Sequence, residues 1–473
     1  MDSQLQDIAE KIIKHASEKK VQYCDVRAEE HFRKSAHIEN GEIEFVKTEQ
    51  HYGVGVRILY NGMWGFCSIS SPDTFDGMIE ILENTIKSVT HYSKNKKNSV
   101  NLAPVPASKA RIDFPVHEKP TIDEMLEIAQ DCDRAIWEYS DIIRSSVSPA
   151  YEITSKYFVN SEGSSILQNY TDVVFHMAAT THGRGITQSV DITEGGRGGI
   201  ERILEDDAVY HSARIIADKA SSLPYTKPVK EEKTTIVMRP NFASLLVHEI
   251  LGHPSEADRV LGNEMAWAGG AWWSGKIGEK IGSEHLNVFD DPTIKNSLGW
   301  YYFDDEGVKA EKTTLVKNGI LENHMQSRET AEIFNTAPTG NMRATNYNFM
   351  PLIRMACTCI EAGDYDIDEI IKDVKDGYLV SNMKVPSIDM MRYNWSISCQ
   401  YAEKIKDGNI TDLHRDVIVS GTAPEFFNSI DACSFDFLVS PITNCGKGDP
   451  MQPLVMGNGS PTIRGKATIK SVL

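Results

Sequence analysis

Apolar residues near the start of the chain recur at the spacings of one amphipathic helix and several half-buried strands. The helical set follows an i, i+3, i+4 pattern with one buried stripe: Leu5, Ile8, Ile12, Ile13 and Ala16. Strand-like runs between residues 35 and 69 flank Asn-Gly pairs at 40–41 and 61–62. Asn-Gly tolerates the positive φ of tight hairpin turns. The pattern therefore predicts an α/β module built from helices and hairpins.

The hydrophobic pattern is less regular in the next hundred residues. Residues 93–120 are polar and rich in proline, which predicts a surface linker or long crossover within this module. Thr121 and Glu124 form a capping-box pattern that predicts a further helix, whereas residues 142–199 read as short β-rich runs. A helix preceded by Ser71 as its N-cap is expected to reach about Tyr92. A Pro-rich segment near residue 225 predicts the boundary between domains at 1–225 and 230–473.

The second domain is predicted to be mostly β, with one apolar helix near its start. A strand at residues 234–238 precedes the helix-like run from Phe242 to Leu251, and strand-like runs follow to the end of the chain. The predicted fold class is α+β. It combines an N-terminal α/β domain with a C-terminal mixed sheet or barrel-like domain that carries the apolar helix.

Composition narrows the function classes. The 473 residues carry a formal net charge of −18, which opposes binding to nucleic acid. The acidic N-terminus does not resemble a signal peptide, and the sequence has no run of the ~20 apolar residues that a membrane span needs. We therefore expect a cytoplasmic protein without a nucleic-acid or membrane partner. The eight widely spaced cysteines do not suggest a disulfide framework.

The apolar helix contains the strongest candidate for chemistry, a metal site at His248, Glu249 and His253. Ordinary zinc-peptidase motifs separate the two histidines by four positions, but here they are five apart, or roughly 140° on a straight α-helix. Both side chains reach one ion only if the helix widens into a π-turn or ends between them. Gly252 and Pro254 supply means for such a distortion. Two partly exposed histidines on an amphipathic helix are the alternative interpretation.

Glu249 beside a metal-ligating histidine is what metal-assisted hydrolysis needs, because a carboxylate can take a proton from metal-activated water. The pattern by itself leaves the third protein ligand open. The Gly- and Trp-rich segment at residues 262–282 follows the motif. It is consistent with a lid over the substrate or with a packed aromatic cluster.

The motif, together with an Asn-Cys-Gly-Lys run at residues 444–447 and a Gly-Asn-Met-Arg run at 340–343, resembles the TldD/PmbA metalloproteases, specifically their TldD-like members. The resemblance implies that Cys445 is the third ligand of a Zn²⁺ ion, that peptides are the substrate, and that the protein works as a homodimer or as a heterodimer with a metal-free paralogue. It implies no other cofactor. Glu256 and Asp258 remain alternative third ligands, because both lie within about a turn of His253.

The predicted function is a zinc-dependent peptidase that acts on unfolded or flexible peptides. His248, His253 and Cys445 would hold the metal, and Glu249 would be the general base. One alternative is a non-catalytic partner subunit that binds peptides. Another is a metal hydrolase of non-peptide substrates.

Overall fold

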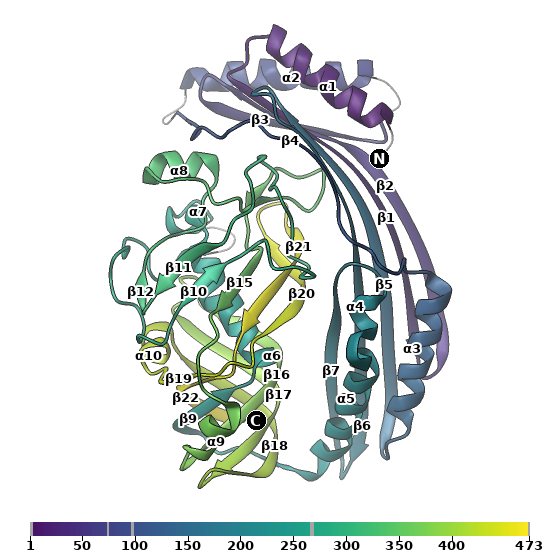
Figure 1. Ribbon diagram of the computed structural model, residues 1–473, viewed down its shortest axis with the longest axis vertical. Helices are drawn as coiled ribbons and strands as arrows, with labels where there is room; N and C mark the ends of the chain where they lie inside the picture. Colours follow the sequence, from purple (N-terminus) through teal and green to yellow (C-terminus); the bar gives the residue numbers. More distant parts are fainter. Residues whose placement is uncertain (1–2, 73–74, 96–98, 265–268, 472–473) are drawn as a thin grey trace.

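The computed structural model describes residues 3–72, 75–95, 99–264 and 269–471. It confirms the α+β fold class, with a long curved sheet in the N-terminal half facing a β-rich C-terminal half (Figure 1). None of its helices is both long enough and apolar enough to span a membrane, as far as the described residues show.

The long sheet has the strand order β3-β2-β1-β5-β6-β4, and β7 pairs with β6. Asn40 and Asn61 have φ of 52° and 48°, so the two predicted hairpin turns are confirmed. The strands are β1 (Tyr23–Glu39), β2 (Glu42–Tyr60), β3 (Met63–Ser70), β4 (Lys109–Asp113), β5 (Ile142–Asn160), β6 (Ser165–Gly183) and β7 (Ile186–Arg197).

Helices cover one face of this sheet in two groups. The pair α1 (Ser3–Glu18) and α2 (Phe75–Tyr92) packs on one end of the sheet, and α3 (Ile122–Trp137) and α5 (Ala208–Ser222) pack on the other (Figure 1). Thr121 caps α3 as predicted, since its hydroxyl accepts a hydrogen bond from the Glu124 N–H at 3.3 Å. The prediction that Ser71 caps α2 is wrong. Ser71 lies in the left-handed region with φ of 49°, and α2 begins at Phe75.

Two predictions for the middle of the first half need correction. The segment 93–120 is more than a linker, because it contains β4, which pairs in parallel with β6. The β-rich runs at 142–199 are long continuous strands, because β5 and β6 each extend over 19 residues. Polar residues interrupt the apolar pattern of these strands, which made them look short. Those polar residues face the C-terminal half, as described below.

The C-terminal half contains a barrel and a second sheet. The barrel is formed by β22, β9, β16, β17 and β18 in that order, and β18 pairs with β22 to close it, which confirms the barrel-like prediction. Its strands are β9 (Glu232–Met238), β16 (Asp376–Ile388), β17 (Asn394–Lys406), β18 (Asn409–Thr422) and β22 (Ile463–Ser471).

The second sheet has the order β12-β11-β10-β15-β21-β20. Its strands are β10 (Val288–Asp290), β11 (Thr313–Lys317), β12 (Ile320–Leu321), β15 (Cys357–Ile360), β20 (Leu438–Lys447) and β21 (Gln452–Ser460). Helix α6 (Pro240–Leu246) follows β9 and packs between barrel strand β16 and the β20–β21 hairpin. The apolar residues of α6 are buried in the largest core cluster of the protein, so the helix is fixed on several sides. The candidate motif continues directly from its end.

Candidate metal centre

The helix widens where the two histidines lie. Residues Val247–Gly252 form a π-helix, and the main-chain N–H of His253 donates to the carbonyl of His248, five residues back. Of the two distortions that the histidine spacing allowed, a π-turn or a helix end, the structure has the π-turn. Gly252 contributes through close packing, since its φ of −69° is ordinary for a helix but an added Cβ would lie 1.9 Å from Met355 Sδ.

Pro254 leaves a carbonyl without its usual helical donor, and a tryptophan satisfies it. In an α-helix the N–H at position 254 would bond the Ile250 carbonyl, but proline has no N–H. Trp272 Nε1 donates to that carbonyl at 3.1 Å instead, and Trp273 Nε1 donates to the Pro254 carbonyl at 2.6 Å. Both indoles are buried. This part of segment 262–282 is thus a packed aromatic cluster that supports the motif, whereas Trp267 lies outside the described residues.

Three potential ligands meet beside the π-turn. The side chains of His248, His253 and Cys445 are buried, and their ligand atoms all lie within 4.8 Å of one another. Cys445 Sγ is 3.4 Å from His253 Nε2, although the two residues are 192 positions apart. The imidazole rings of the histidines are nearly perpendicular, with centroids 4.8 Å apart. Strand β20 carries the cysteine and packs against α6, which explains how such distant residues meet.

Each histidine is oriented through its Nδ1 atom. His248 Nδ1 lies 3.0 Å from Asn458 Oδ1, and the Asn458 amide donates to the Thr358 carbonyl. His253 Nδ1 lies 3.1 Å from Glu256 Oε2. Partners of this kind fix the ring orientation of metal-ligating histidines and leave Nε2 available. Sequence reasoning did not find Asn458, which lies on β21 and 210 positions from His248.

The electrostatics favour a thiolate at the centre. Burial opposes ionisation of Cys445, but His248, His253 and Arg354 together hold its pKa well below the usual value. Burial also opposes the charged form of His248, yet the thiolate, with Glu249 and Asn458, raises its pKa to about 9. The thiolate is the form of cysteine that binds metals. Two imidazoles and a thiolate form the donor set of a catalytic zinc site with one open position.

Glu249 lies at the edge of this centre and contacts an arginine from the barrel. Arg392, in the turn between β16 and β17, donates from Nη1 to Glu249 Oε2 and, at 3.1 Å, to the Glu249 carbonyl. Burial opposes ionisation of Glu249, but His248 and Arg392 outweigh it and lower its pKa to about 2. These contacts favour the carboxylate form of Glu249. Arg392, like Asn458, is a contact of this centre that sequence reasoning did not find.

The two acids considered as alternative third ligands have other partners. Glu256 Oε2 accepts from Arg259 Nε at 2.6 Å as well as contacting His253 Nδ1. Asp258 is held by Lys447 Nζ at 2.7 Å from each of its carboxylate oxygens. The geometry groups Cys445, and neither acid, with the two histidines. It also gives Lys447, two residues after the cysteine, a structural role in anchoring β20.

Comparison with known proteins shows which family the chain resembles. Three domain models match the chain: PmbA/TldA metallopeptidase domain 1 at residues 24–89, the central domain at 116–223 and the C-terminal domain at 231–469. A protein named "Metalloprotease" from Methanothermobacter thermautotrophicus is 32% identical over 94% of this chain and 95% of its own length. One from Saccharolobus solfataricus, named "Zinc metalloprotease TldD homolog", is 26% identical over 96% and 98%.

Solved structures support the same fold. The crystal structure of TldE from Thermococcus kodakarensis matches with a TM-score of 0.74 over 98% of this chain and 100% of that chain, at 20% sequence identity. At this level of identity the match is evidence for the fold alone. It covers the long sheet and the C-terminal half together, so the two halves recur as one architecture.

Proposed function

The chain belongs to the PmbA/TldA metallopeptidase family, and from that premise we propose that it is a zinc-dependent peptidase acting on flexible peptide segments. The observation that carries the proposal is the meeting of His248, His253 and Cys445 within 4.8 Å, with the Glu249 carboxylate beside them. A metal-free partner subunit would have no use for this donor set, so we favour the catalytic role.

The residues of the chain divide the chemistry between them. A zinc ion would bind to the two histidines and the thiolate, and when bound it polarises a peptide carbonyl and promotes the deprotonation of water. Glu249 takes the proton from the attacking water and returns it to the leaving amine. Asn458 and Glu256 keep the imidazoles turned toward the ion.

The position of β20 supports a peptide substrate. This strand carries Cys445 and comes last in the order of the second sheet within the described residues. An extended peptide can add to such an edge through main-chain hydrogen bonds, which are independent of sequence. Pairing along β20 would bring a scissile bond close to the thiolate ligand. Such pairing would favour substrate segments that are flexible enough to become extended.

The direct test is an assay of the purified full-length chain with an unstructured peptide mixture. Cleavage that a chelator abolishes and stoichiometric Zn²⁺ restores is the expected result. Cleavage of small ester or amide substrates with no action on peptides would favour a metal hydrolase of another class. Peptide binding without cleavage in the zinc-loaded protein would favour a non-catalytic role.

We propose that the working form is a dimer, either of two copies or with a metal-free family member. The fold similarity to TldE supports a shared subunit architecture, which is what a heterodimer of related chains requires. Light scattering of the purified chain, alone and mixed with a family member encoded in the same genome, distinguishes the two forms.

Arg392 is expected to position Glu249. Substitution Arg392→Ala should lower kcat by roughly 10-fold to 100-fold, because a charge-assisted hydrogen bond to the carboxylate is lost. Zinc content should remain at one equivalent. Added guanidinium ion should restore part of the rate, a result that a merely structural role of Arg392 does not give. Lys384→Gln is the matched control, because it removes an exposed charge from β16, the strand that leads into the turn with Arg392, and it should leave kcat unchanged.

A further inference from the structure

A cavity of about 590 Å³ lies between the long sheet and the C-terminal half, separate from the metal ligands. Its volume is in the usual range of small-molecule sites. Alternate residues of β6 point into it, whereas the residues between them pack against α3 and α5. The β6 residues in the cavity wall are Gln168, Tyr170, Asp172, Val174 and His176.

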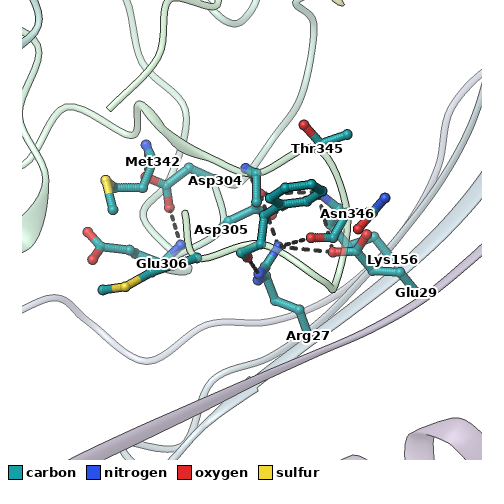
Figure 2. A network of polar contacts seen from close by, with 12 residues as sticks. Arg27, Glu29, Lys156, Asp304, Asp305, Glu306, Met342, Thr345 and Asn346 are labelled. Carbon is teal, nitrogen blue, oxygen red and sulfur yellow. Dashed lines mark hydrogen bonds and ion pairs between the residues drawn. The ribbon is translucent and has the colours of Figure 1, made fainter. Parts of the chain in front are cut away.

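The opposite wall comes from the C-terminal half. Figure 2 shows part of it, where Asp304 and Asp305 precede Glu306 and Lys156 of the long sheet pairs with Asp305. The β20–β21 hairpin contributes Thr443 and Leu454. Because the same hairpin carries Cys445, the cavity and the metal centre share one structural element.

Most of the cations in the cavity wall are already neutralised. Lys156 Nζ is 2.9 Å from Asp305 Oδ1, and Arg197 Nε is 2.7 Å from Asp172 Oδ1. His31 contacts Glu152 at 2.9 Å, and the same carboxylate is 3.5 Å from Arg33. Each of these cations therefore already has a carboxylate partner, although His31 and Arg33 share the carboxylate of Glu152.

Arg343 is different. Its side chain lines the cavity, and the residue is only 8% exposed. Its Nη1 and Nη2 atoms donate to the main-chain carbonyls of Met355 and Val455, at 2.6 and 2.8 Å. No carboxylate of the described residues lies within ion-pair distance of its guanidinium. Burial lowers the pKa of Arg343 more than the nearby Tyr301 raises it.

The acids of the facing turn form no ion pair with Arg343 and have other partners. Asp305 is engaged by Lys156 and by the Ala344 N–H. Asp304 accepts from the N–H groups of Val308 and Met342, yet burial, with the charge of Glu306, raises its pKa well above the usual value. A buried cation without an ion-pair partner is costly, and an anion from outside the chain would relieve that cost.

From this arrangement we infer that the cavity binds a carboxylate, with Arg343 as its anchor. Guanidinium groups match carboxylates in geometry, and the bond is strong where water is excluded. The carboxylate is either the C-terminus of a peptide or a free carboxylic acid. If the ligand is a peptide C-terminus, the inference rests on the proposed peptidase function. The peptidase would then prefer peptides whose C-terminal carboxylate is free. The net charge of −18 by itself would repel acidic ligands. The inferred carboxylate site therefore depends on the local charge of Arg343 and not on the charge of the whole protein.

The test measures binding in full-length protein that carries Glu249→Gln, so that no peptide is consumed. The probe is an unstructured peptide without acidic side chains that carries a dansyl group, which has no carboxylate, at its N-terminus; it is made once with a free C-terminal carboxylate and once with an amide. We expect the free acid to bind at least about tenfold more tightly than the amide. Arg343→Gln should abolish this difference. Arg33→Gln, which removes a cavity cation that already has a carboxylate partner, should preserve it.

Two further measurements keep the inference testable if Arg343→Gln fails to fold. Val174→Trp fills the cavity from the β6 side and should weaken binding of the free acid while Arg343 stays in place. Glutarate, a small dicarboxylate, should compete with the peptide. If glutarate binds but the two peptides do not differ, the ligand is a free acid. Equal binding of both peptides together with no glutarate binding overturns the inference. That result would leave the proposed peptidase function untouched, because peptide cleavage by the parent protein is measured separately.

Discussion

Glu249→Gln should retain one equivalent of zinc and lose ~10²-fold to 10⁴-fold in the rate of peptide cleavage. The amide keeps the shape of the carboxylate and its contact with Arg392, but it cannot accept a proton from water. Zinc content by elemental analysis and kcat from a peptide assay give the two readouts. A variant that cleaves at the parental rate would show that another group is the base. His248→Ala and His253→Ala are the companion variants, and both should lose the metal together with the activity.

Cys445→Ser should weaken zinc binding by roughly 100-fold or more, because zinc sites distribute ~10–16 kcal/mol over about four ligands. Cys433→Ser and Cys399→Ser are matched controls, since both thiols are also buried and free. They should leave zinc affinity unchanged. If Glu256→Ala released the metal and Cys445→Ser did not, the acid next to His253 would be the third ligand.

A chemical measurement on the unmodified protein complements these variants. A thiolate bound to zinc is shielded, so removal of the metal by a chelator should expose one additional thiol to alkylation. Mass spectrometry should map that thiol to Cys445. Alkylation of Cys445 that is indifferent to the chelator contradicts its role as a ligand.

The local geometry of the metal centre could be predicted from sequence, but its surroundings could not. The five-residue spacing of His248 and His253 required a distortion that a π-turn provides, so periodicity alone was enough. Cys445 followed only from the family resemblance. Arg392 and Asn458 reach the centre through the barrel and through β21, and no pattern in the chain indicates such tertiary contacts.

Tertiary contacts that the sequence does not reveal also explain the incorrect strand predictions for the N-terminal half. Strand β4 was missed because its short sequence lies among prolines and forms a strand only by pairing with β6, which starts 56 positions later. The long strands β5 and β6 appeared short because polar residues such as Lys156 and Gln168 interrupt them. Those residues are polar because they line a cavity, and a cavity between the two halves is invisible in the sequence of either half.

The closed barrel has a consequence for the time at which activity can appear. Strand β9, which leads directly into the metal-binding helix, lies between β16 and β22, and β22 is formed by the last described residues of the chain. A chain still attached to the ribosome therefore holds both histidines long before Cys445 and β22 emerge. We predict that ribosome-bound chains stalled before β22 bind no zinc and cleave no peptide, and assays on such stalled chains would test this. The proposed peptidase activity would then appear only after β22 has left the ribosome and closed the barrel.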